Sequence, residues 1–165
     1  VELDAGKVER AIDFVKACTR AGGVAYSPLP GQIGHGDPGR TAGAYWAMRQ
    51  LERKESVVDE MAKYFTGGID KLPDGHASAT MHLWAGGLAS SCAGQETWKK
   101  YWLIHRPLFM ASRIAGGAMD ARPNAETLQL KSNGDRGVGP AYMTGAFVCA
   151  MQLGQNRYKL LDRPR

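Results

Sequence analysis

The feature that most constrains the fold is an alternation between helical segments that carry charge and helical segments that almost lack it. Amphipathic helices, with apolar residues three or four positions apart, are predicted at about 5–21, 56–65 and 95–109. Helices rich in alanine, glycine and aromatic residues are predicted at about 40–52, 76–91 and 140–153. Because a charge-poor helix must be surrounded by protein on most sides, the sequence predicts outer helices that shield inner ones.

The charge-poor segments also repeat one another. Gly43-Ala44-Tyr45 aligns without gaps with Gly145-Ala146-Phe147, and residues 50–51 match residues 152–153. This repetition predicts an all-α domain of three consecutive αα-hairpins. The hairpins would bury their apolar faces by stacking on one another, and they span about 5–52, 55–91 and 95–153.

Three features interrupt this pattern. A long irregular insertion at 115–139 precedes the last helix, and residues 127–130 within it suggest a short strand. Pro107 lies inside the fifth helical pattern and predicts a kink or a break there. Residues 154–165 are polar and are interpreted as a C-terminal tail or linker.

Composition narrows the classes of function. The 165-residue chain has a net charge of +5, but its Lys and Arg residues are scattered, which favours a solvated basic surface over nucleic-acid binding. No run of about 18 apolar residues occurs, so we expect no membrane-spanning helix. Cys18, Cys92 and Cys149 lack close ligand spacing. We therefore expect buried thiols, and neither a metal nor another cofactor.

The first residue and the overall composition bear on the origin of the chain. The chain starts at Val1 rather than at a methionine, which we interpret as a sign that it is a piece of a larger protein. We expect a soluble protein. Its compartment stays open, with export from a bacterial cell as one option.

Short motifs at the predicted helix starts resemble those of a known superfamily. Gly22-Gly23-Val24-Ala25-Tyr26 resembles the Gly-Gly-aromatic-x-Tyr repeat of the terpenoid cyclase and protein prenyltransferase superfamily. Arg40-Thr41-Ala42-Gly43-Ala44 and Gly75-His76-Ala77-Ser78-Ala79 resemble the starts of inner helices in these α/α toroids. The resemblance covers residues 8–153 and is greatest to an uncharacterised bacterial branch. It implies that the three hairpins form part of an α/α toroid.

The chain departs from the superfamily in the residues that carry activity. The Asp-x-Asp-Asp motif of squalene-type cyclases, the zinc ligands of prenyltransferases and the thioester motif of complement-like toroids have no match in it. A complete toroid has about twice as many hairpins, so three would form an open arc with exposed apolar ends. The resemblance therefore implies neighbouring repeats as partners, or self-association through the terminal helices.

Histidines and aspartates near the starts of inner helices are the first candidates for catalysis. His35 and Asp37 precede the helix at 40–52, and His76 begins the helix at 76–91. In a toroid these loops line one mouth of the ring, where a histidine beside a carboxylate can act as a general base. The alternative is that Asp37 caps its helix, His35 is exposed, and His76 serves in capping or packing.

Two carboxylates of the insertion are further candidates. Asp120 and Asp135 lie in the long loop at 115–139, and long loops often carry function. They are the carboxylates that we would assign first to a sugar or metal site. The alternative is that they belong to a solvated loop.

Aromatic residues on the inner helices are candidates for the wall of an apolar cavity. These residues are Tyr45, Trp46, Trp84, Tyr142 and Phe147. In a cyclase-like toroid their π faces would stabilise a cationic intermediate. Without an acid to start that chemistry, ordinary core packing is the favoured alternative.

These observations favour one function and leave a second open. The favoured function is a non-catalytic helical repeat module that binds partners as part of a larger bacterial protein. The alternative is a toroid-type enzyme that acts on a polysaccharide or an isoprenoid at the mouth formed by the inner helices. Its catalytic residues would come from His35, Asp37, His76, Asp120 and Asp135.

Overall fold

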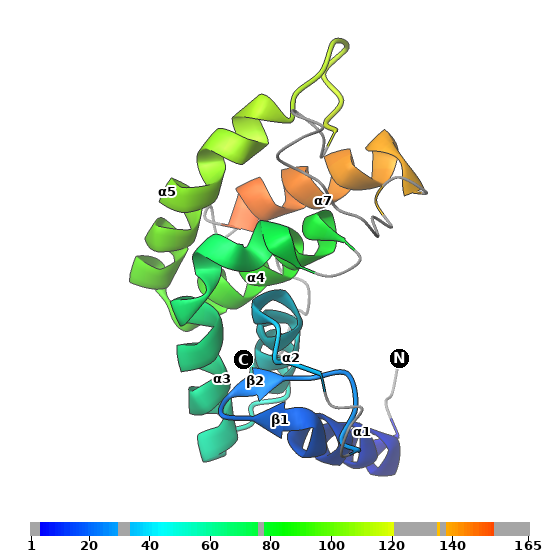
Figure 1. The fold of residues 1–165 in the computed structure, drawn as a ribbon, viewed down its shortest axis with the longest axis vertical. Helices are drawn as coiled ribbons and strands as arrows, with labels where there is room; N and C mark the ends of the chain where they lie inside the picture. The colour runs from blue at the N-terminus through cyan, green and yellow to red at the C-terminus, as the bar shows by residue number, and fades with distance from the viewer. Residues whose placement is uncertain (1–3, 30–33, 76–77, 121–134, 136–137, 154–165) are drawn as a thin grey trace.

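The computed structural model describes residues 4–29, 34–75, 78–120, 135 and 138–153, and they form a mostly helical fold (Figure 1). The helices, in chain order, are α1 (Ala5–Cys18), α2 (Pro38–Gln50), α3 (Ser56–Gly67), the 3-10 helix η1 (Ile69–Asp74), α4 (Ala79–Ala93), α5 (Gln95–Ala111) and α7 (Pro140–Gln152). None of these helices is both long enough and apolar enough to cross a membrane.

A short β-hairpin corrects the all-α prediction. After α1, the strands β1 (Thr19–Arg20) and β2 (Gly23–Val24) pair antiparallel. The two residues of the turn both have positive φ, 47° at Ala21 and 79° at Gly22. Such a turn matches the twist of the paired strands, which is why the chain reverses here as a hairpin rather than as an irregular loop.

Helix α4 lies at the centre of the packing. It contacts α2 on one side, and α7, α5 and η1 on others, while α3 packs against α2 (Figure 1). The charge-poor helix α4 therefore contacts both of the other charge-poor helices, α2 and α7, while α3 packs against α2 and α5 packs against α4. The curvature expected of a toroid stays a prediction.

Glycines in α4 explain how its neighbours approach so closely. A Cβ atom at Gly86 would overlap the side chain of Leu72 in η1. A Cβ atom at Gly87 would lie 3.2 Å from the hydroxyl of Tyr101 in α5. That hydroxyl donates a 2.7 Å hydrogen bond to the carbonyl of Leu83, so the small residues of α4 let α5 and η1 pack onto its backbone.

Buried aromatic residues form much of the core. Phe109 of α5 and Phe147 of α7 are fully buried and meet edge to face, with 5.1 Å between their ring centroids. Tyr45 of α2 lies 5.2 Å from Phe65 of α3. Each buried aromatic residue removes a large apolar area from water, so these pairs hold α5 to α7 and α2 to α3.

Local residues explain where three of the helices begin or continue. Asp4 caps α1, because its carboxylate accepts a 2.9 Å hydrogen bond from the amide of Lys7. Helix α3 starts at Ser56, and Glu55 occupies its N-cap position without a side-chain capping hydrogen bond. Of the kink or break predicted at Pro107, the break was wrong: α5 continues to Ala111, and Phe109 in its last turn is fully buried.

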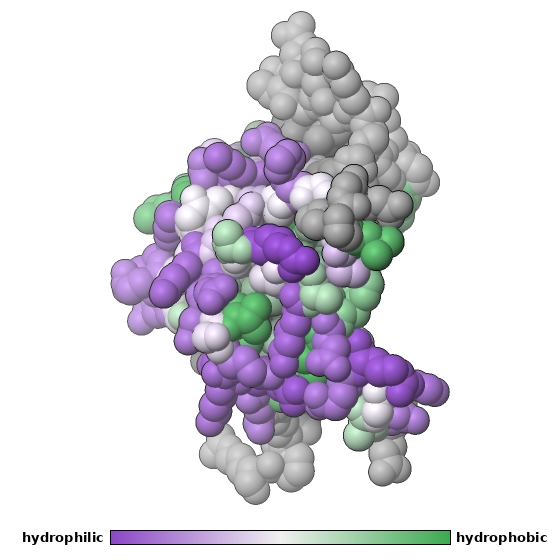
Figure 2. Space-filling model, turned by 60° about the horizontal axis from the view of Figure 1, so that its bottom comes forward, coloured by the Kyte–Doolittle hydropathy of each residue, from purple (hydrophilic) through white to green (hydrophobic). Residues whose placement is uncertain are grey.

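The structure describes only some of the residues in the predictions for the cysteines, the short strand and the C-terminal tail. Cys18 is buried as expected, whereas Cys92 and Cys149 are half-buried. The suggested strand at 127–130 and the tail at 154–165 lie outside the described residues. The face shown in Figure 2 is mostly hydrophilic, and its hydrophobic residues reach the surface in separate patches.

Candidate binding site between α2 and α4

A cavity of about 490 Å³ lies between α2 and α4, beside the loop that follows β2. Most of its wall is apolar, and these residues are Gly43, Ala44, Trp46, Ala47, Met81, Trp84, Ala85 and Leu88. Its polar lining comes from Tyr26, Arg40, Ser78 and His82. Small-molecule sites have volumes of about 300–1,000 Å³ and the same mixture of apolar walls and a few polar groups.

The sequence builds this cavity from small residues that face each other. A Cβ atom at Gly43 of α2 would lie 3.8 Å from the Cβ atom of Ala85 in α4, so the two helices approach closely there. Such short side chains cannot fill the adjacent space, and Trp46 and Trp84 wall it instead. The alanine and glycine content of the two helices is therefore the physical origin of the cavity.

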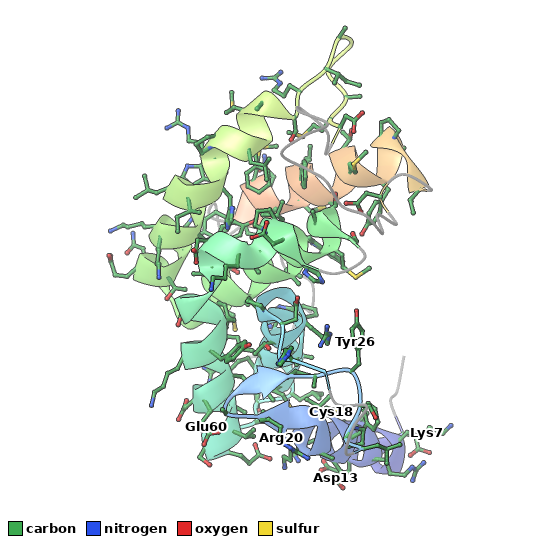
Figure 3. The ribbon with its side chains drawn as sticks, viewed as in Figure 1. Lys7, Asp13, Cys18, Arg20, Tyr26 and Glu60 are labelled. Carbon is green, nitrogen blue, oxygen red and sulfur yellow. The ribbon has the colours of Figure 1, made fainter. Side chains whose placement is uncertain are left out.

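Arg40 and Tyr26 form one side of the polar lining. The guanidinium carbon of Arg40 lies 3.6 Å from the centroid of the Tyr26 ring, in a cation–π contact. The guanidinium also donates a 2.9 Å hydrogen bond from Nη1 to the carbonyl of Val24 in β2. Figure 3 shows the Tyr26 side chain pointing away from α1. The β-hairpin and its following loop thus hold the cation in place.

His82 and Asp37 form a second polar contact of the site. Asp37 caps α2 by accepting a 2.9 Å hydrogen bond from the amide of Arg40. The same carboxylate oxygen lies 3.4 Å from Nδ1 of the buried His82 ring. Cβ atoms at Gly39 or Gly75 would overlap this ring, so two glycines make room for it. The result is an imidazole held beside a carboxylate, with the imidazole in the cavity wall.

Asp135 and Ser78 hold the start of α4. The Asp135 carboxylate is buried and accepts hydrogen bonds from the Ser78 hydroxyl and, at 3.1 Å, from the amide of Thr80. Ser78 also caps α4 by accepting a 2.9 Å bond from the amide of Met81. A helix N-terminus favours negative charge, so this carboxylate stabilises α4 and fixes Ser78 in the cavity wall.

The structure gives each described candidate for catalysis its own surroundings. His35 is exposed, as the alternative interpretation predicted, and Asp37 lies beside His82. Asp120 is half-buried in the turn after α5, where its amide donates a 2.7 Å hydrogen bond to the carbonyl of Ser112. His76 lies outside the described residues.

Asp135 is buried against α4, so the solvated-loop alternative for this residue was wrong. His82 was not among the predicted site residues. Its spacing of four residues from Ser78 places both on one face of α4, and that signal was available in the sequence.

The predicted cavity-lining aromatic residues divide into two groups. Trp46 and Trp84 line the cavity. Tyr45 and Phe147 pack in the core against α3 and α5, as the core-packing alternative predicted, and neither lines this cavity. Tyr142 is half-buried and packs against the same core. The charge-poor helices are buried on several sides, and periodicity alone does not tell which side faces the cavity.

Comparison of the chain with protein family models, curated proteins and solved structures finds no significant match. Within the described residues, no three His, Cys, Asp or Glu side chains lie close enough together to hold a metal ion. The chemistry of the site therefore has to be derived from the cavity and its polar lining.

Proposed function

We propose that this chain is a non-catalytic helical repeat module whose function is binding, with the cavity between α2 and α4 as its binding site. The cavity itself carries the proposal: about 490 Å³, walled largely by apolar side chains that include Trp46 and Trp84. Transfer of an apolar group from water into such a space is favourable, because it removes apolar surface from water on both partners.

We also propose that the module is part of an α/α toroid, and the helix packing supports this. Charge-poor α4 contacts both of its charge-poor neighbours, α2 and α7, while α3 and α5 pack against α2 and α4. In an arc of αα-hairpins this order makes α2, α4 and α7 the inner helices. Neighbouring repeats of a larger bacterial protein, or a second copy of the chain, would extend the arc from α1 and α7.

Exposed apolar residues on the two terminal helices support such contacts. Phe14 of α1 and Val148 of α7 both remain exposed. Sedimentation of the wild-type chain and of a Phe14→Gln, Val148→Gln double variant tests this part. We expect concentration-dependent association of the wild type that the double variant weakens. A wild type that stays monomeric at every concentration contradicts self-association and leaves the cavity proposal standing.

Binding of N-phenyl-1-naphthylamine, an uncharged apolar dye that fluoresces on leaving water, tests the cavity. Ala85→Leu places three more carbons in the cavity, and leucine is nearly as good a helix former as alanine. We expect this variant to bind the dye about tenfold more weakly than the wild type. Ala111→Leu, the same change at an exposed position in α5, is the matched control.

Three outcomes of this titration contradict the binding proposal. The first is a wild type that does not bind the dye. The second is an Ala85→Leu variant that is folded, as judged by circular dichroism, and binds the dye as the wild type does. The third is an equal loss of binding in Ala85→Leu and Ala111→Leu, which would place the dye outside the cavity.

A second candidate function is the toroid-type enzyme, and the contact between Asp37 and His82 is the observation that favours it. A carboxylate beside an imidazole can orient the ring and stabilise its protonated form, as a general base requires. Mass spectrometry after incubation with polysaccharides and isoprenoids tests this function. Turnover by the wild type that His82→Asn abolishes would support the enzyme. Turnover that survives in His82→Asn excludes this pair as its catalytic centre.

A further inference from the structure

We propose that the cavity between α2 and α4 takes an apolar small molecule that ends in a carboxylate, and that Arg40 binds this carboxylate. The inference rests on the proposed binding function of the cavity and adds the chemical class of its ligand. Its basis is a half-buried cation in a cavity whose other walls are mostly apolar.

The charge of the cavity wall is one-sided. Among the described residues that line it, Arg40 carries a permanent positive charge and none is acidic. The nearby Asp37 carboxylate already accepts a hydrogen bond from the backbone of α2 and lies against the His82 ring. A ligand with a negative end therefore meets attraction at the Arg40 end of the cavity.

Arg40 has an open edge for such a group. Nη1 donates to the carbonyl of Val24, and the guanidinium carbon lies over the Tyr26 ring. In the part of the chain that the structure describes, Arg40 forms no ion pair, and no residue accepts a hydrogen bond from its Nε or Nη2. These two nitrogens form the fork that binds a carboxylate with two parallel hydrogen bonds.

The position of the cation is preorganised, which favours binding. The hydrogen bond to Val24 and the cation–π contact with Tyr26 restrict the long arginine side chain before any ligand arrives. Less conformational entropy is therefore lost on binding than for a freely rotating arginine. The apolar wall, with Trp46 and Trp84, then receives the remainder of the molecule.

Calorimetric titration of the full 165-residue chain with octanoate and with 1-octanol tests the inference. The two probes share an apolar chain and differ in the charge of the end group. We expect octanoate to bind the wild type about tenfold more tightly than 1-octanol, since a charge-assisted hydrogen-bond pair is stronger than a neutral one. Arg40→Gln should remove this preference while 1-octanol binding is kept.

Two further variants make the result specific. Arg49→Gln removes the same charge from the exposed side of α2 and should keep the full preference for octanoate. Arg40→Lys keeps the charge without the planar fork and should keep part of the preference for octanoate. Thermal unfolding of each variant checks that the Arg40 substitutions leave the chain folded, because Arg40 also bonds to β2.

Each outcome has one meaning. Equal binding of octanoate and 1-octanol by the wild type overturns the inference and leaves the cavity as a binding site for neutral apolar groups. A preference for octanoate that persists in folded Arg40→Gln overturns the role of Arg40. Failure of both probes, together with failure of the uncharged dye, overturns the proposed function as well.

Discussion

The imidazole of His82 lies 3.4 Å from the carboxylate of Asp37, measured between Nδ1 and Oδ1, and this contact joins the starts of α4 and α2. The ring is buried, and it fits because Gly39 and Gly75 carry no side chain. The polar end of the cavity therefore depends on two glycines as much as on the two residues in contact.

Gly39→Ala tests this dependence. The added Cβ atom would overlap the His82 ring, so either the ring or α2 has to move. We expect the free energy of unfolding to fall by about 1–3 kcal/mol, as measured by urea denaturation. Gly145→Ala in α7 is the matched control, because its Cβ atom meets nothing within 4 Å. The free energy of unfolding of that variant should rise by about 0.5–1 kcal/mol, because alanine is a better helix former than glycine. A decrease equal to that of Gly39→Ala would contradict this explanation.

Asp135→Asn tests whether the buried Asp135 carboxylate stabilises the N-terminus of α4. One of the two buried oxygens becomes an amide nitrogen, which cannot accept the hydrogen bond that Ser78 or Thr80 donates, and the favourable charge at the helix N-terminus is lost. We expect a loss of about 1–3 kcal/mol in the free energy of unfolding. Asp13→Asn, at an exposed position of α1, should change it by less than about 0.5 kcal/mol. An Asp135→Asn variant with the same free energy of unfolding as the wild type would mean that the carboxylate does not stabilise α4.

His105 should make the stability of the fold depend on pH. Its Nε2 donates a 2.8 Å hydrogen bond to the carbonyl of Ile69, and burial lowers the pKa of the imidazole below its ordinary 6.5. The hydrogen bond and the nearby Asp70 oppose this shift without cancelling it. The unfolded chain then binds a proton at a higher pH than the folded chain. The contribution of uncharged His105 to the stability of the fold is complete above pH 6.5. It is lost as the pH falls from there through the pKa of His105 in the folded chain.

Urea midpoints measured between pH 8 and pH 5 check this prediction. His105→Gln keeps a side-chain N–H donor for Ile69 but does not titrate, so its midpoint should fall less steeply over this range. His35→Gln replaces an exposed histidine and should retain the wild-type slope. Identical slopes for the wild type and His105→Gln would show that His105 does not cause the dependence.

Glu55 links α1 to the segment between α2 and α3, and this link should be sensitive to acid and to salt. Its carboxylate lies 2.9 Å from Nζ of Lys16 and 3.2 Å from Nε of Arg53. The bond from Lys16 is the largest cause that lowers the Glu55 pKa from 4.5 to about 2. This contribution to stability is present above pH 4.5 and is lost as the pH falls through about 2.

The melting temperature of Glu55→Gln in low and high salt checks the link. We expect the variant to melt below the wild type in low salt, and the gap to narrow in 1 M NaCl because the ions screen exposed pairs. Glu60→Gln, at an exposed position of α3, should show a smaller gap. A gap that is independent of salt would point to packing rather than charge.

Several parts of the fold could be predicted from the sequence because their causes are local. The cap at Asp4, the start of α5 at Gln95 and the start of α7 at Pro140 all follow from residues within one helical turn. The hairpin between α1 and α2 was missed because its turn depends on positive φ at Ala21, a residue that rarely adopts it. Asp37 was predicted both as a cap and as a site residue, and its capping role is confirmed.

The sequence by itself determined which helices are charge-poor, because this property depends only on the residues within each helix. A helix of this kind must be covered by protein on most sides. Only the tertiary structure decided which sides of those helices meet. Trp46 faces the cavity while its neighbour Tyr45 faces α3, and Asp37 contacts His82 across 45 positions of the chain. Such choices depend on how whole helices pack against one another, and a repeat of three or four residues carries no information about a partner distant in the chain.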